Sequence, residues 1–495
     1  MSEGEPRNSG RAPGRTVEDS QAGVEDTRSN VEDSRSNVED SHFCLVSDSE
    51  EAFVLRAATA RLARHTLDLQ YYVWEDDRIG KLLVYRALEA ARRGVKVRLL
   101  LDHANQLGRD VKWAALNAHP NVEIRLFNPF QGRYKHFIQW LYHAPRLNHR
   151  MHNKAWIVDG ERALVGGRNI SDHYFGVHAE ANFRDLDIYA RGPIVAETRA
   201  AFDAYWHSDV CVRLRSLRRR SRVHADRLWE KLVTWRRGLL GFPYRYEQDV
   251  DHFKDVLGAA DRRQVQAPAA LLFDPPDKAK GATQRLMGDQ LGRLLGQRAP
   301  WEILIEASYF IPGDAFTASL AALHRDGCRV ALLTNSLATN DVIAAHSAYA
   351  RYRPALLRGG VEVHELQPNA RARSHHARLL RGRGRSKSSL HTKAMVLDRR
   401  ELFVGSFNLD PRSVNVNTEM GYYVDSEALA GEVATFVEEG MAPQNSYRIT
   451  SDDQGLLWGA GDERGPVQYR REPQVSLARW LAAWLCALLP IENLL

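Results

Sequence analysis

The chain has 495 residues, of which 44% are hydrophobic and 26% charged, with a formal net charge of +6. This length allows two or three domains, and the composition is that of a folded globular protein. No segment reaches the roughly 18–20 apolar residues of a membrane span, and no secretory signal is visible, so we expect a soluble or peripheral protein. Four scattered cysteines, without metal-ligand or disulfide-framework spacing, favour a reducing environment.

Residues 1–42 are polar and carry a seven-residue repeat of Val-Glu-Asp, starting at positions 17, 24, 31 and 38. One valine in seven residues cannot form a coiled-coil seam, which needs two apolar positions. We therefore expect a disordered tail and assign no chemistry to it.

Residues 43–210 have the pattern of a first globular domain. Residues 51–65 predict an amphipathic helix, 66–73 a strand, 81–93 a helix that stops at Gly94, and 95–101 a buried strand. A strand, a helix and a strand in this order imply a right-handed crossover in a parallel or mixed sheet covered by helices.

Residues 266–440 repeat the plan as a second domain. A strand is expected at 301–310, a helix at 315–325 that stops at Gly327, and a strand at 330–334. The basic, aromatic segment 211–265 is predicted to link the halves, and 441–495 to form a C-terminal tail. The fold class is therefore α/β, with one domain plan used twice.

One short motif occurs in both halves, 239 residues apart. Counted from the histidine, each copy has Lys at +2, Asp at +7, Gly at +14 and Asn at +17. The first copy is His152, Lys154, Asp159, Gly166 and Asn169, and the second is His391, Lys393, Asp398, Gly405 and Asn408. A single short motif is a weak signal. Two copies in one register are a strong signal, because core packing does not demand polar residues at matching positions.

The residue types of the motif suit phosphoryl transfer. In an extended strand, positions i and i+2 point to the same face, so each histidine and its lysine are expected to project together. An imidazole serves as nucleophile, base or acid near neutral pH, while lysine and asparagine hold phosphate oxygens. Two facing sets would clamp a phosphodiester, with one histidine to attack and the other to protonate the leaving oxygen. No metal ion or other cofactor is then expected, because two lysines supply the positive charge.

The acidic residues have two interpretations. Asp159 and Asp398 belong to the motif and are candidate catalytic residues, yet both occupy positions where a hairpin turn favours aspartate. Acidic partners for the second nitrogen of each imidazole are also expected, and Asp185 and Glu419 follow the two asparagines at suitable distance. The copies differ at Gly167 and Ser406, so the site need not be symmetric.

These motifs resemble the paired motifs of the phospholipase D superfamily, over roughly residues 45–495. Five further stretches are similar to the bacterial cardiolipin synthase C type: residues 66–72, 126–130, 150–154, 333–337 and 405–412. The resemblance implies two α/β/α sandwich domains related by a pseudo-twofold axis, with one active site between them.

The resemblance also implies a metal-independent, two-step phosphatidyl transfer that makes cardiolipin from phosphatidylglycerol and a second phospholipid. His152 would attack phosphorus to form a phosphatidyl-histidine, and His391 would protonate the departing alcohol and deprotonate the incoming one. Which histidine attacks is left open by the near symmetry of the motifs. Lys154, Lys393, Asn169 and Asn408 would hold the phosphate, and Asp185 and Glu419 would orient the histidines.

Other substrates and roles must be weighed, because the superfamily also contains phospholipases and nucleases. Arginine-rich runs at 213–222 and 371–387 could follow a nucleic-acid backbone or form solvated loops. The basic, aromatic segment 133–142 and the apolar segment 480–489 favour a lipid interface, although the latter could instead pack on the body. Arg470, Arg471 and Arg479 would favour anionic headgroups. A catalytically inactive scaffold is the third alternative, against which the two intact motifs argue.

We expect phospholipids and an anionic membrane surface as partners, at the cytoplasmic side of the bacterial inner membrane, and no nucleic acid. A protein partner is not indicated by the sequence.

Overall fold

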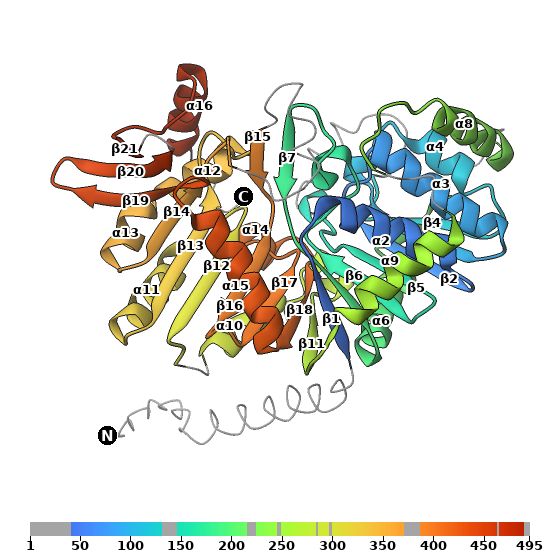
Figure 1. Ribbon diagram of the computed structural model, residues 1–495, viewed down its shortest axis with the longest axis horizontal. Helices are drawn as coiled ribbons and strands as arrows, with labels where there is room; N and C mark the ends of the chain where they lie inside the picture. The colour runs from blue at the N-terminus through green and yellow to red at the C-terminus, as the bar shows by residue number, and fades with distance from the viewer. Residues whose placement is uncertain are drawn as a thin grey trace, which may run out of the picture.

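The computed structural model describes residues 41–130, 146–214, 224–244, 249–283, 286–296, 299–370, 387–462 and 465–489. The repeat at the N-terminus, the segment 133–142 and nearly all of the two arginine-rich runs lie outside the described residues. The chain folds into two halves, each with a central sheet and helices (Figure 1). The predicted α/β class is confirmed.

The first half is built on a nine-stranded mixed sheet. In spatial order its strands are β10 (Val265–Gln266), β1 (His42–Val46), β8 (Asp187–Arg191), β6 (Arg162–Gly166), β5 (Ala155–Val158), β2 (Thr66–Tyr71), β3 (Lys96–Asp102), β4 (Val122–Phe127) and β9 (Cys211–Arg213).

The second half is built on a ten-stranded mixed sheet. Its order is β11 (Ala269–Phe273), β18 (Met420–Asp425), β17 (Glu401–Gly405), β16 (Lys393–Leu397), β12 (Glu302–Ala307), β13 (Arg329–Asn335), β14 (Glu362–Leu366), β19 (Ser446–Asp452), β20 (Gly455–Asp462) and β21 (Gly465–Tyr469).

The two sheets share an eight-strand arrangement with the same order and directions, from β1 to β9 in the first half and from β11 to β19 in the second. In the first half, β2, β3 and β4 are parallel neighbours, and β5 joins β2 antiparallel. In the second half, β12, β13 and β14 are parallel, and β16 joins β12 antiparallel. The crossover helices, α3 (Arg78–Arg92) and α11 (Gly313–Arg325), lie between matching strands. Both end before a glycine with positive φ, Gly94 at 104° and Gly327 at 95°, as expected of helix stops.

Further helices pack on the sheets or on the helices that cover them. In the first half these are α2 (Ser49–Leu62), α4 (Asp110–Leu116), α8 (Ala225–Arg237) and α9 (Val250–Arg262), and in the second half α10 (Met287–Gly296), α12 (Ile343–Ala350), α13 (Arg353–Arg358) and α14 (Pro411–Asn415). No helix of the described residues is long and apolar enough to cross a membrane.

The halves share one hydrophobic core. Helix α6 (Pro193–His207) of the first half packs against β11 of the second, and α15 (Glu427–Met441) of the second packs against β1 of the first. Between them, Phe43 meets Tyr422 edge to face, and the Tyr422 hydroxyl lies 2.7 Å from that of Thr198. One buried cluster therefore contains residues of both sheets, which fixes the two motifs relative to each other.

The segment boundaries differ from those predicted around the middle and the end of the chain. Residues 211–265 are not a separate linker, because β9 pairs with β4, β10 pairs with β1, and α8 and α9 pack on α3 and α2. Aromatic contacts hold this segment against the first domain: Trp229 stacks on Tyr85, with 4.9 Å between the ring centroids. Likewise, residues 446–469 extend the second sheet by three strands, and only α16 (Leu477–Ala487) projects beyond it.

Candidate active site

The two motif histidines lie where the halves meet. His152 and His391 stand just before β5 and β16, on short segments that pair with the opposite half. The His152 N–H donates to the Thr418 carbonyl at 2.8 Å, and the His391 N–H donates to the Arg184 carbonyl at 2.8 Å. The second contact continues a parallel two-stranded sheet between β7 (Ala181–Arg184) and β15 (Lys387–Leu390). Each histidine therefore lies within three residues of the strand that follows it.

Each imidazole is held by a carboxylate from the other half. The Nδ1 atom of His152 lies 2.8 Å from Oε2 of Glu419, and Nδ1 of His391 lies 2.7 Å from Oδ2 of Asp185. All four side chains are buried. The predicted acidic residues thus lie beside the histidines, and the structure adds that they are exchanged across the interface. With Nδ1 engaged, the Nε2 atom of each ring is the one left for chemistry.

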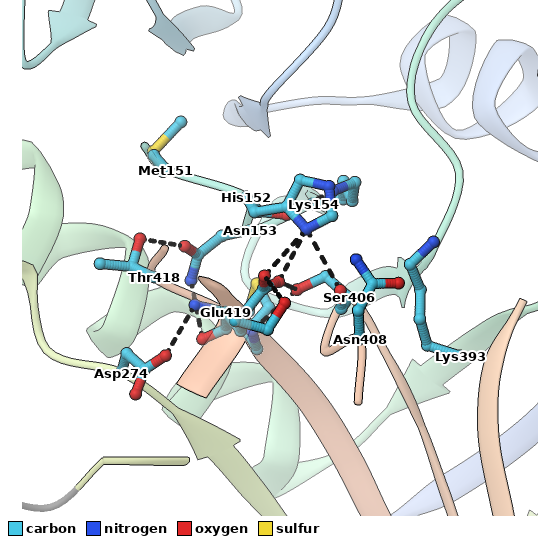
Figure 2. A network of polar contacts seen from close by, with 12 residues as sticks. Met151, His152, Asn153, Lys154, Asp274, Lys393, Ser406, Asn408, Thr418 and Glu419 are labelled. Atoms are coloured by element: carbon cyan, nitrogen blue, oxygen red, sulfur yellow. Dashed lines mark hydrogen bonds and ion pairs between the residues drawn. The ribbon is translucent and has the colours of Figure 1, made fainter. Parts of the chain in front are cut away.

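Glu419 is fixed from several directions (Figure 2). Its carboxylate accepts hydrogen bonds from the Ser406 hydroxyl at 2.5 Å and the Ser413 hydroxyl at 3.0 Å. Its backbone N–H donates to Asp274 at 2.9 Å. Asp274 forms a buried ion pair with Lys278, whose ammonium also donates to the Ser413 carbonyl. This network leaves the carboxylate little freedom to move away from His152.

Asp185 has different surroundings, as the Gly167–Ser406 difference suggested. Its Oδ1 atom accepts a hydrogen bond from the Leu186 N–H at 2.8 Å. A Cβ added to Gly167 would lie 2.2 Å from Oδ1, so no larger residue fits while the carboxylate is there. The first copy of the motif therefore has glycine where the second has a serine hydroxyl.

The lysines and asparagines surround the same region. The Nζ atom of Lys393 lies 3.0 Å from Nδ1 and 3.2 Å from Nε2 of His391, and Lys154 Nζ donates to the His152 carbonyl. Asn408 Oδ1 accepts a hydrogen bond from Ser308 at 2.8 Å, and Asn169 Oδ1 accepts one from the Val73 N–H at 3.1 Å. Both amides are thereby oriented.

Burial makes the imidazoles neutral. It lowers the pKa of His152 to about 4, although Glu419 acts in the opposite direction. It also lowers the pKa of His391 well below its usual value, and Lys393 and Lys154 add to this effect. Burial opposes the ionisation of Glu419, but contact with His152 and Lys154 holds the pKa of this carboxyl below its usual value. A neutral imidazole beside an ionised carboxylate is the state required of a nucleophile.

The other carboxylate and lysine titrate near neutral pH. Burial raises the pKa of Asp185 to about 7, although Lys393 acts against this. Burial lowers the pKa of Lys393 to about 8, while Asp185 and Glu419 raise it. The Asp185–His391 pair can therefore take up a proton close to neutral pH, as a general acid and base should.

The motif aspartates lie at the hairpin ends of their strands. Asp159 has φ of 55° and accepts hydrogen bonds from three backbone N–H groups, those of residues 64, 65 and 66, at 2.7–2.9 Å. Asp398 has φ of 53° and accepts from the N–H groups of Trp301 and Glu302 at 2.7 and 3.0 Å. These contacts favour the turn interpretation over the catalytic one, because each carboxylate ties a hairpin to the neighbouring strand.

Sequence analysis missed Tyr174 and Ser413, which share one offset of +22 from the two histidines. The Tyr174 hydroxyl lies 3.4 Å from Nε2 of His391 and accepts a hydrogen bond from the Asn169 amide at 2.9 Å. Ser413 contacts Glu419, as described above. The register comparison gives no signal for either residue, because the two copies have different residue types at this offset. The described residues contain no cluster of three or more histidine, cysteine, aspartate or glutamate side chains that could hold a metal ion.

Comparison with known proteins defines the fold and the family of this chain. The family model "Cardiolipin synthase, PLD-like domain" matches residues 58–206 and 297–440, one match in each half. The solved phosphatidylserine synthase of Haemophilus influenzae Rd KW20 has a similar fold, with a TM-score of 0.55 at 14% identity, covering 84% of this chain and 91% of that one. The fold is therefore that of the phospholipase D-like class.

Sequence relatives define the family more closely. The chain is 39% identical over 456 residues to cardiolipin synthase C of Escherichia coli K12, covering 90% of this chain and 94% of the relative. An uncharacterised protein of Helicobacter pylori 26695 is 30% identical, covering 89% and 87%. The chain belongs to the cardiolipin synthase family of phospholipase D-like proteins, as the motifs predicted.

Proposed function

We propose that this protein is a phosphatidyltransferase that makes cardiolipin from phosphatidylglycerol and a second phospholipid, through a phosphatidyl-histidine. The observation that carries the proposal is the exchanged pair of imidazole–carboxylate contacts, which leaves two Nε2 atoms for one phosphodiester. Family membership supports the reaction class, and the contacts of each residue support the role given to it below.

In the first step, Nε2 of His152 attacks phosphorus, and the bond from phosphorus to the leaving oxygen breaks as His391 donates a proton to that oxygen. In the second step, His391 takes the proton of a glycerol hydroxyl, whose oxygen attacks phosphorus and displaces His152. The assignment of attack to His152 is supported by its partner Glu419, which stays ionised, whereas the Asp185–His391 pair takes up a proton near neutral pH.

Lys154, Lys393, Asn169 and Asn408 are proposed to hold the phosphate oxygens, so that no metal ion is needed to offset the developing charge. Asp185 and Glu419 are positioning residues for the histidines. Because the substrates are membrane lipids, we place the protein peripherally at the cytoplasmic face of the bacterial inner membrane.

The test is incubation of purified protein with labelled phosphatidylglycerol in detergent micelles containing EDTA, with and without phosphatidylethanolamine. Cardiolipin is expected, and labelled single-stranded DNA in a parallel reaction should stay intact. Phosphatidic acid alone would instead indicate hydrolysis, and DNA cleavage without any lipid product would identify a nuclease.

The two histidines can be separated by single-turnover labelling. His391→Ala should accumulate label on His152 when the donor has a good leaving group, because departure then needs no acid. His152→Ala should accumulate none. Label on His391 in the His152→Ala variant would reverse the assigned roles.

A further inference from the structure

Helix α16 presents its large apolar side chains outward. The side chains turned towards the body are small: Ala482, Ala483 and Cys486 are half-buried, and α12 is the helix against which they pack. The opposite face is exposed and consists of Leu477, Trp480, Leu481, Trp484, Leu485 and Leu488. Trp484 is 52% exposed and Leu485 57%. In a helix that packs on a soluble protein, the large apolar side chains face the body and the polar ones face solvent. In α16 the large apolar side chains face solvent instead.

Polar contacts hold α16 in this orientation. The Arg479 guanidinium donates to the Leu337 carbonyl at 2.6 Å and to the Asn340 carbonyl. The Ser347 hydroxyl donates to the Ala483 carbonyl at 2.9 Å. Arg479 is thus engaged with the body, which corrects its predicted role at lipid headgroups. Half of the large apolar side chains that the described residues expose lie in α16 and the two residues after Ala487.

The loop that anchors α16 also contacts the active site. This loop, residues 336–340, receives the Arg479 bonds and, through the Thr339 carbonyl, a hydrogen bond from Ser389 at 2.7 Å. Ser389 lies on β15, two residues before His391. In Figure 1, α16 and the β7–β15 pair stand at the same, upper edge of the molecule. A surface that received α16 would therefore lie on the same side of the molecule as the β7–β15 edge, which leads to His391.

We propose that the exposed face of α16 inserts into the surface of the phospholipid bilayer and brings the β7–β15 edge of the site to the membrane. The size of the helix fits this role: eleven residues span about 16 Å, enough to lie in the interface but not to cross it. Two tryptophans among leucines are the composition that a membrane interface favours. The choice of a bilayer rests on the proposed function, because the substrates reside there.

The test is flotation with vesicles of phosphatidylglycerol and phosphatidylethanolamine. Leu485→Glu combined with Trp484→Gln should lower the vesicle partition coefficient by about 10- to 100-fold, because apolar area is then no longer buried in lipid. The matched control is Leu240→Glu, which changes a 91% exposed leucine in the other half of the chain and should float like wild type. Circular dichroism and thermal melting check that all variants fold.

Two activity measurements distinguish docking from chemistry. The α16 variant should lose activity on vesicles in proportion to its binding, yet keep wild-type activity on substrate dissolved in detergent. Unchanged flotation of the variant would overturn the docking proposal. The docking proposal would also be overturned if sedimentation showed that the substitutions dissociate a dimer while the variant still binds vesicles. An inactive wild type in detergent would contradict the proposed function alone, because flotation does not depend on turnover.

Discussion

At the scale of single residues, the site consists of two imidazole–carboxylate pairs. The two carboxylates differ in the hydrogen bonds that hold them in place. Glu419 is surrounded by two hydroxyl donors and anchored through Asp274 and Lys278, whereas Asp185 lies against a glycine. A carboxylate that holds Nδ1 sets the tautomer of the ring and stabilises the imidazolium. The unequal support therefore gives the two histidines different acid–base behaviour, although their motifs are nearly identical.

Glu419→Gln and Asp185→Asn should each lower kcat by about 10²–10⁴-fold, because an amide keeps the shape but does not stabilise an imidazolium. Steady-state assays in detergent would measure this. Glu161→Gln, at an exposed glutamate beside the first hairpin, is the control and should have no effect. Wild-type kcat in either site variant would refute the role of that carboxylate.

The pH profile should have an alkaline limb set by Lys393. Burial lowers the pKa of this lysine to about 8, so it loses its charge as the pH rises through that value. Because the charged form is the one proposed to hold phosphate, kcat/KM should fall about tenfold per pH unit above the pKa. A profile of kcat/KM that stays flat to pH 10 would show that Lys393 remains charged or is not needed.

At the scale of elements, the hairpins that follow the histidines carry the motif aspartates. Asp159→Gly removes the carboxylate and keeps a residue suited to the positive φ of this turn. Loss of its hydrogen bonds to backbone N–H groups should lower the free energy of unfolding by about 1–3 kcal/mol. Urea denaturation would measure this change, and kcat of the folded variant should stay near wild type. Lost turnover at unchanged stability would restore the catalytic interpretation.

The turn after β6 carries a second test. Gly167→Ala would place a Cβ 2.2 Å from Oδ1 of Asp185 and displace the carboxylate that orients His391. We expect kcat to fall by at least about tenfold, because small displacements of a positioned group are costly. Gly431→Ala is the matched control in α15, where nothing lies within 4 Å of the added Cβ. Equal activity of the two variants would show that Asp185 adapts.

Local patterns predicted the elements well. The strand at 66–73, the helix at 81–93 and the turn at Asp159 were found within a few residues of their predicted ends, because alternation, helix stops and turn chemistry are encoded locally. The repeated register also predicted two like domains.

The exchange of carboxylates could not be predicted. No local sequence pattern indicates that Asp185 contacts His391 rather than His152. The placement of α8 and α9 on the first domain was missed for a related reason. Their packing on α3 and α2 depends on tertiary contacts such as the stacking of Trp229 on Tyr85.

At the scale of the whole molecule, the site exists only where the two halves share a core. Helices α6 and α15 each cross to the opposite half, and Phe43 packs on Tyr422. The two halves are therefore parts of one proposed catalytic unit, and each holds the carboxylate that contacts the histidine of the other.

Mixing inactive variants should test whether one chain forms the whole site. His152→Ala and His391→Ala proteins, purified and combined, should show no recovery of transfer, because each site takes both histidines from the same chain. Wild type mixed with either variant should keep activity in proportion to its amount. Recovery in the mixture of the two variants would indicate that halves are exchanged between chains.

The pairing of His152 with Glu419 also has a consequence for biosynthesis. The two residues are separated by 267 positions in the chain. At a synthesis rate of about 5–20 residues per second, the ribosome adds Glu419 about 13–53 s after His152. Throughout that interval the nascent protein carries a histidine and a lysine without their partner carboxylate. We therefore expect the growing chain to have no transfer activity towards nearby lipids until the second domain has emerged and folded.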